Sequence, residues 1–422
     1  MKERTIIHNA RIPGSLTLKD LTIEDGRFTS VKDAQPQISI RDENKVVDVK
    51  GRVVLPGFVD VHMHLDKALT WPAINNFSGT LAEAVWRYEE AQEYMDVDSI
   101  EERMKATILK SIQHGTTAIR THLNYSTSSY LYKVVEAFQK VQSSLSDSIT
   151  LEAVLMCPFE ITKDVEKDIH WAITNGIHLL GGAPHLAQNP QDNLAKIFEL
   201  ASSLNVNIDL HIDESDDPAV KTLEDVCKWT IQTGYQGRVV AGHCTSLSAM
   251  DESEAFNLME LAQRAKIGIV TLPSSNLFLM GREDKGLIRR GLTRVKQLIE
   301  LNIPVAAASD NIQDPFHPFG KADLLQIALL TSYGAHLTAE NDLEKLIEMI
   351  TSMPAKLMKL DGYGIDAGNW ADFIIFDITD LRMILTELPA SRESWRRGHP
   401  ICRVTESVTW AKENPAFLNY TL

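Results

Sequence analysis

Residues Leu55-Pro56-Gly57-Phe58-Val59-Asp60-Val61-His62-Met63-His64-Leu65-Asp66 form an apolar, β-branched run that ends in two histidines on alternate residues. Successive side chains of a strand point to opposite faces, so His62 and His64 share one face and can bind one metal ion. A single His-x-His pair is weak support for a metal site, because a histidine in such a run is more often a hydrogen-bonded structural residue. The metal interpretation therefore depends on ligands elsewhere in the chain.

Short β-branched runs alternate with helical patterns from Pro56 to residue 310, which is typical of a parallel sheet built from βα units. Helices are predicted over residues 99–114 and 223–233, and a glycine follows each of them. Eight strands with intervening helices describe a (β/α)8, TIM-like barrel. The predicted strands cover residues 53–64, 117–122, 151–157, 177–181, 206–211, 239–243, 267–271 and 305–310.

The two ends of the chain carry strand patterns without intervening helices. They include residues 6–12, a turn at Glu24-Asp25-Gly26-Arg27, and residues 371–377. We predict that the ends pair into one small β-sandwich domain, formed by residues 1–55 and 366–422, beside a catalytic barrel of residues 56–365. The predicted fold class is α/β.

The chain has 42 Lys and Arg against 57 Asp and Glu, a formal charge of −15, which argues against nucleic acid or an anionic membrane as the partner. A neutral or cationic small molecule fits better. No apolar run reaches membrane-span length and residues 1–5 carry no signal-peptide pattern, so we expect a cytoplasmic protein. Cys157, Cys227, Cys244 and Cys402 form no close pair, so we expect reduced and mostly buried thiols rather than disulfides or a zinc-cysteine site.

Metal-binding side chains recur where the predicted barrel strands end, and a barrel gathers those ends at one rim, where its active site lies. The predicted ligands of one divalent ion are His62, His64, His211 and Asp310. Imidazole and carboxylate groups suit zinc or divalent iron and leave one position open for water. Each residue alone has a structural alternative, such as capping a carbonyl or a turn, but their joint presence at one rim favours the metal site.

Glu214 lies three residues beyond His211, close enough to reach the open position of the metal without occupying it. A metal-bound water has a pKa of roughly 7, and a nearby glutamate can accept its proton and deliver it to a leaving amine. Glu214 is therefore the predicted proton shuttle. The alternative is a solvated loop acid beside Asp213, Asp216 and Asp217.

His243 and His122 also end predicted strands. His243 is either a further ligand or a donor that orients the water and stabilises charge in the tetrahedral intermediate, and with four ligands assigned we favour the second role. The predicted catalytic residues are thus Glu214, His243 and the ligand Asp310. His122 is a residue that supports the ligands from behind, a substrate contact, or a packed histidine.

With these residues in place, the chain resembles the amidohydrolase superfamily, and within it the cytosine-deaminase-like branch. It is also similar to the N-isopropylammelide isopropylaminohydrolases. The resemblance covers nearly the whole length. The matching segments are residues 56–67, 78–81, 120–122, 211–214, His243, 281–282, 290–296, 309–311, 363–365 and 368–372.

The resemblance implies a distorted (β/α)8 barrel with a small β-sandwich, and it implies the same roles for the ligands, Glu214 and His243. It also implies a homo-oligomer, although nothing in the chain identifies an interface. The strand at which binuclear members keep a carbamylated lysine ends here in Leu155-Met156-Cys157-Pro158. A single zinc or iron ion is therefore expected.

Two departures from the cytosine deaminase pattern concern the substrate. Pro158 is followed by Phe159 and Glu160 instead of a glutamine, and Asn311 stands where the family has a second aspartate, as in the branch that removes alkylamines from triazines. An aromatic face stacks but cannot make paired hydrogen bonds, so cytosine itself is disfavoured. The predicted substrate contacts, with loop packing as the alternative for each, are Leu81, Phe159, Glu160, His185, Gln188, Asn276, Asn311, Asp314 and Phe316.

The leading hypothesis is a metal-dependent hydrolase that removes an exocyclic amine from an aminoheterocycle, so that ammonia or an amine leaves. The alternatives are a cyclic-amide hydrolase, an alkylamine-releasing triazine- or pterin-type aminohydrolase, and a non-catalytic metal-binding barrel.

Overall fold

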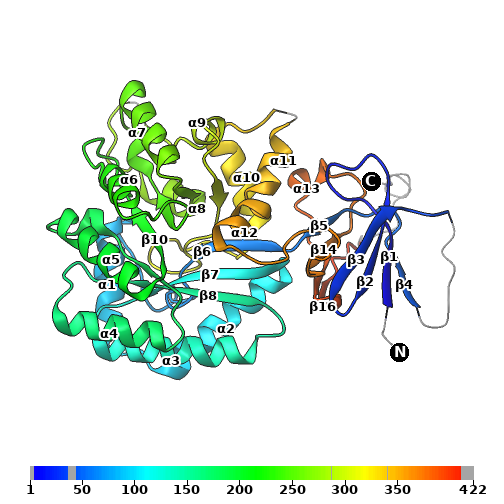
Figure 1. The fold of residues 1–422 in the computed structure, drawn as a ribbon, viewed down its shortest axis with the longest axis horizontal. Helices are drawn as coiled ribbons and strands as arrows, with labels where there is room; N and C mark the ends of the chain where they lie inside the picture. Colours follow the sequence, from blue (N-terminus) through cyan, green and yellow to red (C-terminus); the bar gives the residue numbers. More distant parts are fainter. Residues whose placement is uncertain (1–3, 37–43, 287, 340, 410–422) are drawn as a thin grey trace.

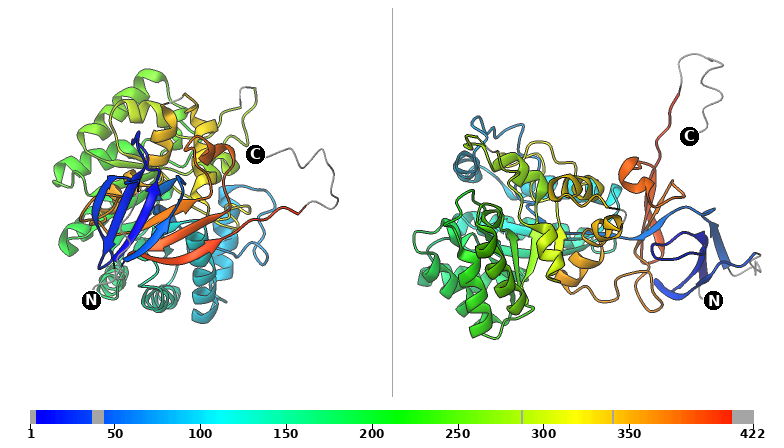
Figure 2. Two further views of the ribbon diagram at one scale, coloured as in Figure 1. Left: turned by 90° about the vertical axis from the view of Figure 1, so that its right-hand side faces the viewer. Right: turned by 90° about the horizontal axis from the view of Figure 1, so that it is seen from above.

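A computed structural model of the protein describes residues 4–36, 44–286, 288–339 and 341–409. A helix-covered barrel lies beside a smaller body made of strands from both ends of the chain (Figures 1 and 2). The barrel strands are β6 (Phe58–Met63), β7 (Thr116–Asn124), β8 (Thr150–Met156), β9 (Leu179–Gly181), β10 (Asn207–Ile212), β11 (Val239–His243), β12 (Gly268–Thr271) and β13 (Val305–Ala307). They form one eight-stranded sheet in sequential order, and each hydrogen-bonded pair within it is parallel.

Helices cover the outside of this sheet because each presents an apolar face to it. In α3, for example, that face buries Tyr130, Val134 and Phe138, while every residue of β6 is buried. The helices are α1 (Leu81–Gln92), α2 (Val97–Gln113), α3 (Ser128–Ser144), α4 (Lys163–Thr174), α5 (Pro190–Leu204), α6 (Thr222–Gln232), α7 (Glu252–Arg264), α8 (Pro273–Leu279), α9 (Val295–Glu300), α10 (Leu324–Ala335), α11 (Asp342–Glu348), α12 (Ser352–Met358) and α13 (Met383–Thr386), with short 3-10 turns at Pro184–Leu186 and Thr245–Ser248.

The barrel closes between its first and last strands, β6 and β13, only near their carboxyl ends. There the amide of Asp310 donates to the carbonyl of His62 at 2.9 Å, and the amide of His64 donates to the carbonyl of Asp310 at 3.2 Å. Lower down the two strands separate, and the amides of Val59 and Ala307 bond instead to the segment that leads into α12. This insertion distorts the barrel, as the family resemblance implied.

The smaller body consists of two four-stranded sheets that pack face to face, which confirms the predicted β-sandwich built from both termini. One sheet contains β1 (Arg4–Ala10), β2 (Lys19–Glu24), β3 (Arg27–Asp33) and β4 (Asn44–Asp48), and the other contains β5 (Val54–Pro56), β14 (Phe373–Phe376), β15 (Arg392–Arg396) and β16 (His399–Val404). Phe28 from the first sheet packs on Phe373, whose ring stacks on Trp395 at 5.1 Å. The predicted turn at 24–27 joins β2 to β3, with Asp25 and Gly26 at positive φ.

The predicted strand over residues 53–64 is two elements, because β5 belongs to the small sandwich and β6 to the barrel. Gly57 separates them: its amide donates to the carbonyl of Asp372, and a side chain at this position would lie 2.3 Å from that of Thr117. The predicted helices are α2 and α6, each shifted by one or two residues. The predicted domain limits stay a prediction.

Within the part of the chain that the structure describes, no helix is both long enough and apolar enough to cross a membrane. All four cysteines are free thiols, and Cys157, Cys227 and Cys244 are buried.

Candidate metal centre

The barrel strands bring the four predicted ligands to one point at their carboxyl ends. The Nε2 atoms of His62 and His64 lie 3.1 and 3.0 Å from the Nε2 atom of His211. The Oδ1 atom of Asp310 lies 3.7 Å from His62 Nε2 and 3.3 Å from His64 Nε2. All four side chains are buried.

This arrangement fits a divalent cation by its spacing and by its unpartnered atoms. Ligands about 2.1 Å from a tetrahedral ion stand about 3.4 Å apart, which is the spacing found here. Asp310 Oδ1 is buried and has no hydrogen-bond partner. Burial also lowers the pKa of His62, His64 and His211, which favours the neutral imidazoles that bind metals.

The backbone holds these groups in conformations that side chains rarely adopt. Asp310 has a φ of 61°, and its amide and carbonyl bond to the strand that carries the two first histidines. His243 and Cys244 follow one another at φ 68° and 50°. Left-handed non-glycine residues cost free energy and cluster at functional sites, where the surrounding structure enforces them.

Gly242 lies where β11 passes close to the His62 ring. A Cβ atom at this position would lie 3.0 Å from the Cε1 atom of His62, tighter than almost all real contacts. Gly242 is also the register partner of His211 in β10. The sequence Gly242-His243 therefore makes room for one histidine and supplies another.

His243 lies beside this group, and its Nδ1 atom is held by two side chains. Glu214 Oε1 lies 3.2 Å away and Asn276 Nδ2 lies 2.9 Å away, while Asn276 Nδ2 is also 3.3 Å from Glu214 Oε1. Burial alone would lower the pKa of His243, but the charge and hydrogen bond of Glu214 raise it above its ordinary value. His62, His211, His243 and Asp310 each offer a ligand atom within 4.8 Å of the others, so His243 is close enough to be a ligand as well.

His122 lies behind the ligands and does not line the cavity. Its ring is 4.0 Å from that of His62, and its Nε2 atom is 3.7 Å from Asp209 Oδ1. Asp209 in turn accepts from Arg120 Nη1 at 2.7 Å, and Arg120 Nε donates to Glu152 at 2.7 Å. These hydrogen bonds and ion pairs link Glu152, Arg120, Asp209 and His122 to His62 through the barrel interior, and no sequence pattern indicated the role of Asp209.

A cavity of about 460 Å³ opens above His64, His211, Glu214, His243 and Asp310. Five of the predicted substrate contacts line it: Leu81, Phe159, His185, Asn311 and Phe316. Burial lowers the pKa of His185 to about 4, so this side chain is neutral near pH 7. The cavity wall combines aromatic and aliphatic side chains with polar and charged ones, among them Lys67, Glu89 and Glu93.

The other predicted contacts do not reach the cavity wall. Glu160 and Gln188 are exposed loop residues outside the cavity lining, whereas Asn276 is buried beside His243 and Glu214. Asp314 is fully buried, and its carboxylate accepts hydrogen bonds from Asn311 Nδ2 at 2.7 Å and from the amides of residues 316 and 317. Asp314 therefore positions Asn311 instead of facing the cavity.

The cavity also contains residues that the sequence analysis did not single out. Lys67 is 5 % exposed, and its Nζ atom lies 4.5 Å from the ring of Phe316. Tyr88 and Asn124 line the same wall. Lys67 follows His64 by three residues in the loop after the first barrel strand. Its closeness to a predicted ligand in the sequence is the feature that could have identified it as a cavity residue.

Comparisons with known proteins agree with this geometry. The profile of the Amidohydrolase family matches residues 53–406. A pterin deaminase of Rhizobium rhizogenes is 29% identical over 417 residues, covering 95% of this chain and 94% of that protein. An N-isopropylammelide isopropyl amidohydrolase of a Pseudomonas species is 27% identical, covering 88% and 90%. The structure of 5-methylcytosine deaminase from Klebsiella pneumoniae with 5-fluorocytosine superposes with a TM-score of 0.89 at 27% identity, covering 96% and 99%.

Proposed function

The chain belongs to the amidohydrolase family, and we propose that it is a metal-dependent hydrolase that removes an exocyclic amine from a nitrogen heterocycle. The observation that carries the proposal is the convergence of three histidines and an aspartate beside Glu214 at the base of one cavity. The relatives described above support it, because their names place their chemistry on amino-substituted rings.

The proposed ligands of one zinc or iron ion are His62, His64, His211 and Asp310. When bound, such an ion supplies Lewis acidity and a water whose pKa is near 7. Glu214 is placed to accept a proton from the attacking water and to return it to the departing nitrogen. Its side chain is 8% exposed and is held by His243 and Asn276, so little reorganisation is needed.

His243 is the proposed donor to the oxygen that forms on the ring carbon. Its Nε2 atom is buried and has no partner, while Nδ1 faces Glu214 and Asn276. In the neutral ring the Asn276 amide donates to Nδ1 and leaves the proton on Nε2. In the charged ring both nitrogens carry protons, so Nε2 is a donor in either state.

The cavity supports a flat, largely uncharged ring as the substrate. Phe159 and Phe316 offer aromatic faces for stacking, and Asn311 and His185 offer hydrogen-bonding groups for ring edges. The formal charge of −15 also supports a neutral or cationic small molecule over nucleic acid. A cytoplasmic location belongs to the same proposal.

An ammonia-release screen tests this proposal. Metal-replete protein is incubated with pterins, pyrimidines, triazines and creatinine-like rings, and ammonia or amine is measured beside the heterocyclic product. We expect one equivalent of ammonia or alkylamine per turnover from at least one aminoheterocycle. Ring opening without amine release, or no turnover across the panel, would contradict the proposal.

A further inference from the structure

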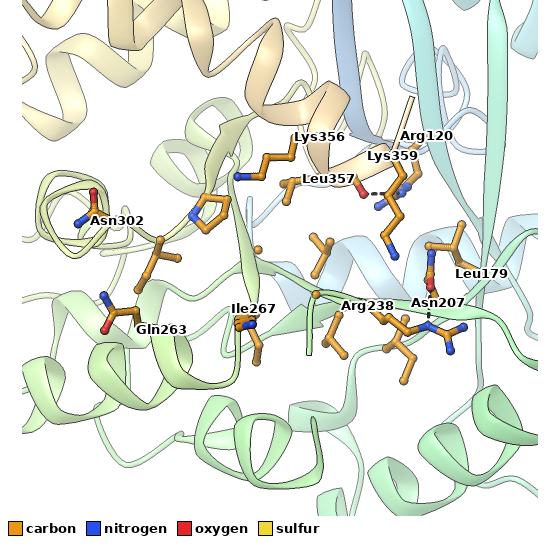
Figure 3. A pocket seen from close by; sticks show the side chains of 18 residues that line it. Arg120, Leu179, Asn207, Arg238, Gln263, Ile267, Asn302, Lys356, Leu357 and Lys359 are labelled. Atoms are coloured by element: carbon orange, nitrogen blue, oxygen red, sulfur yellow. Dashed lines mark hydrogen bonds between the residues drawn. The ribbon is translucent and has the colours of Figure 1, made fainter. Parts of the chain in front are cut away.

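A second cavity, of about 320 Å³, lies at the opposite mouth of the barrel. Its wall is formed by the first residues of β9, β10, β11 and β12 and by the segment before β13, and α12 covers it (Figure 3). The proposed active site lies at the other ends of the same strands. The two cavities are therefore separated by the barrel core.

The lining of this basal cavity is strongly cationic. Five of its eighteen residues are Arg or Lys and none is Asp or Glu, in a chain whose formal charge is −15. The five are Arg120, Arg238, Lys266, Lys356 and Lys359. Positive charge gathered around a concave site attracts anions.

Only one of these cations is neutralised by carboxylates. Arg120 pairs with Asp209 and Glu152, and it also donates to the carbonyl of Leu357 in α12. Arg238 donates to two amide oxygens, Asn207 Oδ1 at 2.9 Å and Asn205 Oδ1 at 3.1 Å, which leave its charge uncompensated.

The three lysines are exposed, and within the described residues their ammonium groups make no hydrogen bond or ion pair. Figure 3 shows Lys359 extending from the end of α12 toward Arg238 and Asn207. Burial, followed by the charges of Arg238 and Arg120, lowers the pKa of Lys359. A neighbouring anion would relieve this repulsion.

Apolar side chains form most of the remaining wall, together with the amides of Asn207, Gln263 and Asn302. Ile208, Val239 and Ile267 come from the barrel, and Leu357 closes the cavity from α12 by packing against Gly268. Such a wall can cover a hydrocarbon or aromatic body, while Lys359 and Arg238 hold a charged head group.

We propose that this basal cavity binds a small organic anion, namely a phosphate or carboxylate on an apolar body. The head group lies between Arg238 and Lys359, the two cations that Figure 3 draws on the same side of the cavity, and their N–H groups donate to its oxygens. Phosphate and carboxylate share this recognition, because both present several acceptor oxygens to a cation.

Calorimetric titration with phenyl phosphate and with benzoate tests the proposal. We expect one saturable site per chain for at least one of them, and the stronger binder identifies the head group. Inorganic phosphate should bind about tenfold more weakly than phenyl phosphate, because it leaves the apolar wall uncovered. Equal binding of the two phosphates would overturn the role of the wall.

The double variant Arg238→Gln/Lys359→Gln should weaken binding about tenfold, since it removes two cations from the head-group site. The matched control Lys163→Gln/Lys167→Gln makes the same charge change on exposed α4 and should bind within twofold of the wild type. Retained affinity in the first variant, or no saturable binding to the wild type by either anion up to about 10 mM, would overturn the proposal.

Discussion

The variant Glu214→Gln tests the proposed proton shuttle, because it replaces one carboxylate oxygen with an amide nitrogen. The substitution preserves the volume of the side chain, and the amide oxygen can still accept the contacts that His243 Nδ1 and Asn276 Nδ2 make at 3.2 and 3.3 Å. What the glutamine cannot do is take up a proton. General acid–base catalysis contributes about 10²- to 10⁴-fold to the rate, or roughly 3–5 kcal/mol of transition-state stabilisation.

We therefore expect kcat of the Glu214→Gln protein to fall about 10²- to 10⁴-fold while KM changes less than about threefold. The assay is steady-state ammonia release on the best ring of the screen, with metal content measured on the same samples. Asp217→Asn is the matched control, because it makes the same chemical change three residues further along the loop, on an exposed side chain. Its kcat should stay within twofold of the wild type.

Two outcomes would refute the reasoning about Glu214. One is a variant whose kcat stays within tenfold of the wild type, since the loss of an essential proton carrier should lower kcat by at least about 10²-fold. The other is a loss of activity that accompanies an equal loss of bound metal, which would make Glu214 part of the ion's binding site instead of a shuttle.

Two further predictions concern buried charges. Arg120→Met should lower the free energy of unfolding by about 3–5 kcal/mol in urea titrations, because it leaves Asp209 buried without its cation. The control Arg87→Met breaks a partly exposed ion pair and should lower the free energy of unfolding by under about 1 kcal/mol. Equal effects of the two variants would contradict this prediction. Burial raises the pKa of Asp314 to about 7, so the native state keeps a proton that the unfolded chain releases near pH 4, and this group lowers stability as pH rises between those values. Asp314→Asn should flatten the fall in melting temperature between about pH 4 and 7, and an unchanged slope would count against it.

The sequence predicted the barrel and the convergence of the four proposed ligands, because strand periodicity and parallel topology determine both. His62 and His64 share a face by strand geometry alone, and the parallel topology gathers His211 and Asp310 at the same rim. It missed the break at Gly57, since the run from Val53 to His64 is continuous and only the partner strands divide it.

Loop residues were harder to place than strand residues. Asn276 lies in α8, which places its side chain beside His243. Asp314 lies in a turn, where its carboxylate accepts a hydrogen bond from Asn311. Neither placement follows from spacing, because a loop's course depends on distant packing. The pairing of Arg120 with Asp209 required three-dimensional structure for the same reason, since 89 residues separate them.

Metal removal and stepwise reconstitution test the central claim most directly. The protein is stripped with a chelator and titrated with zinc or divalent iron, and amine release is measured at each step. The four converging ligands predict that chelation abolishes turnover and that activity returns linearly to a break at one equivalent per chain. Full turnover in the stripped protein, or a break at two equivalents, would contradict a single-ion hydrolase.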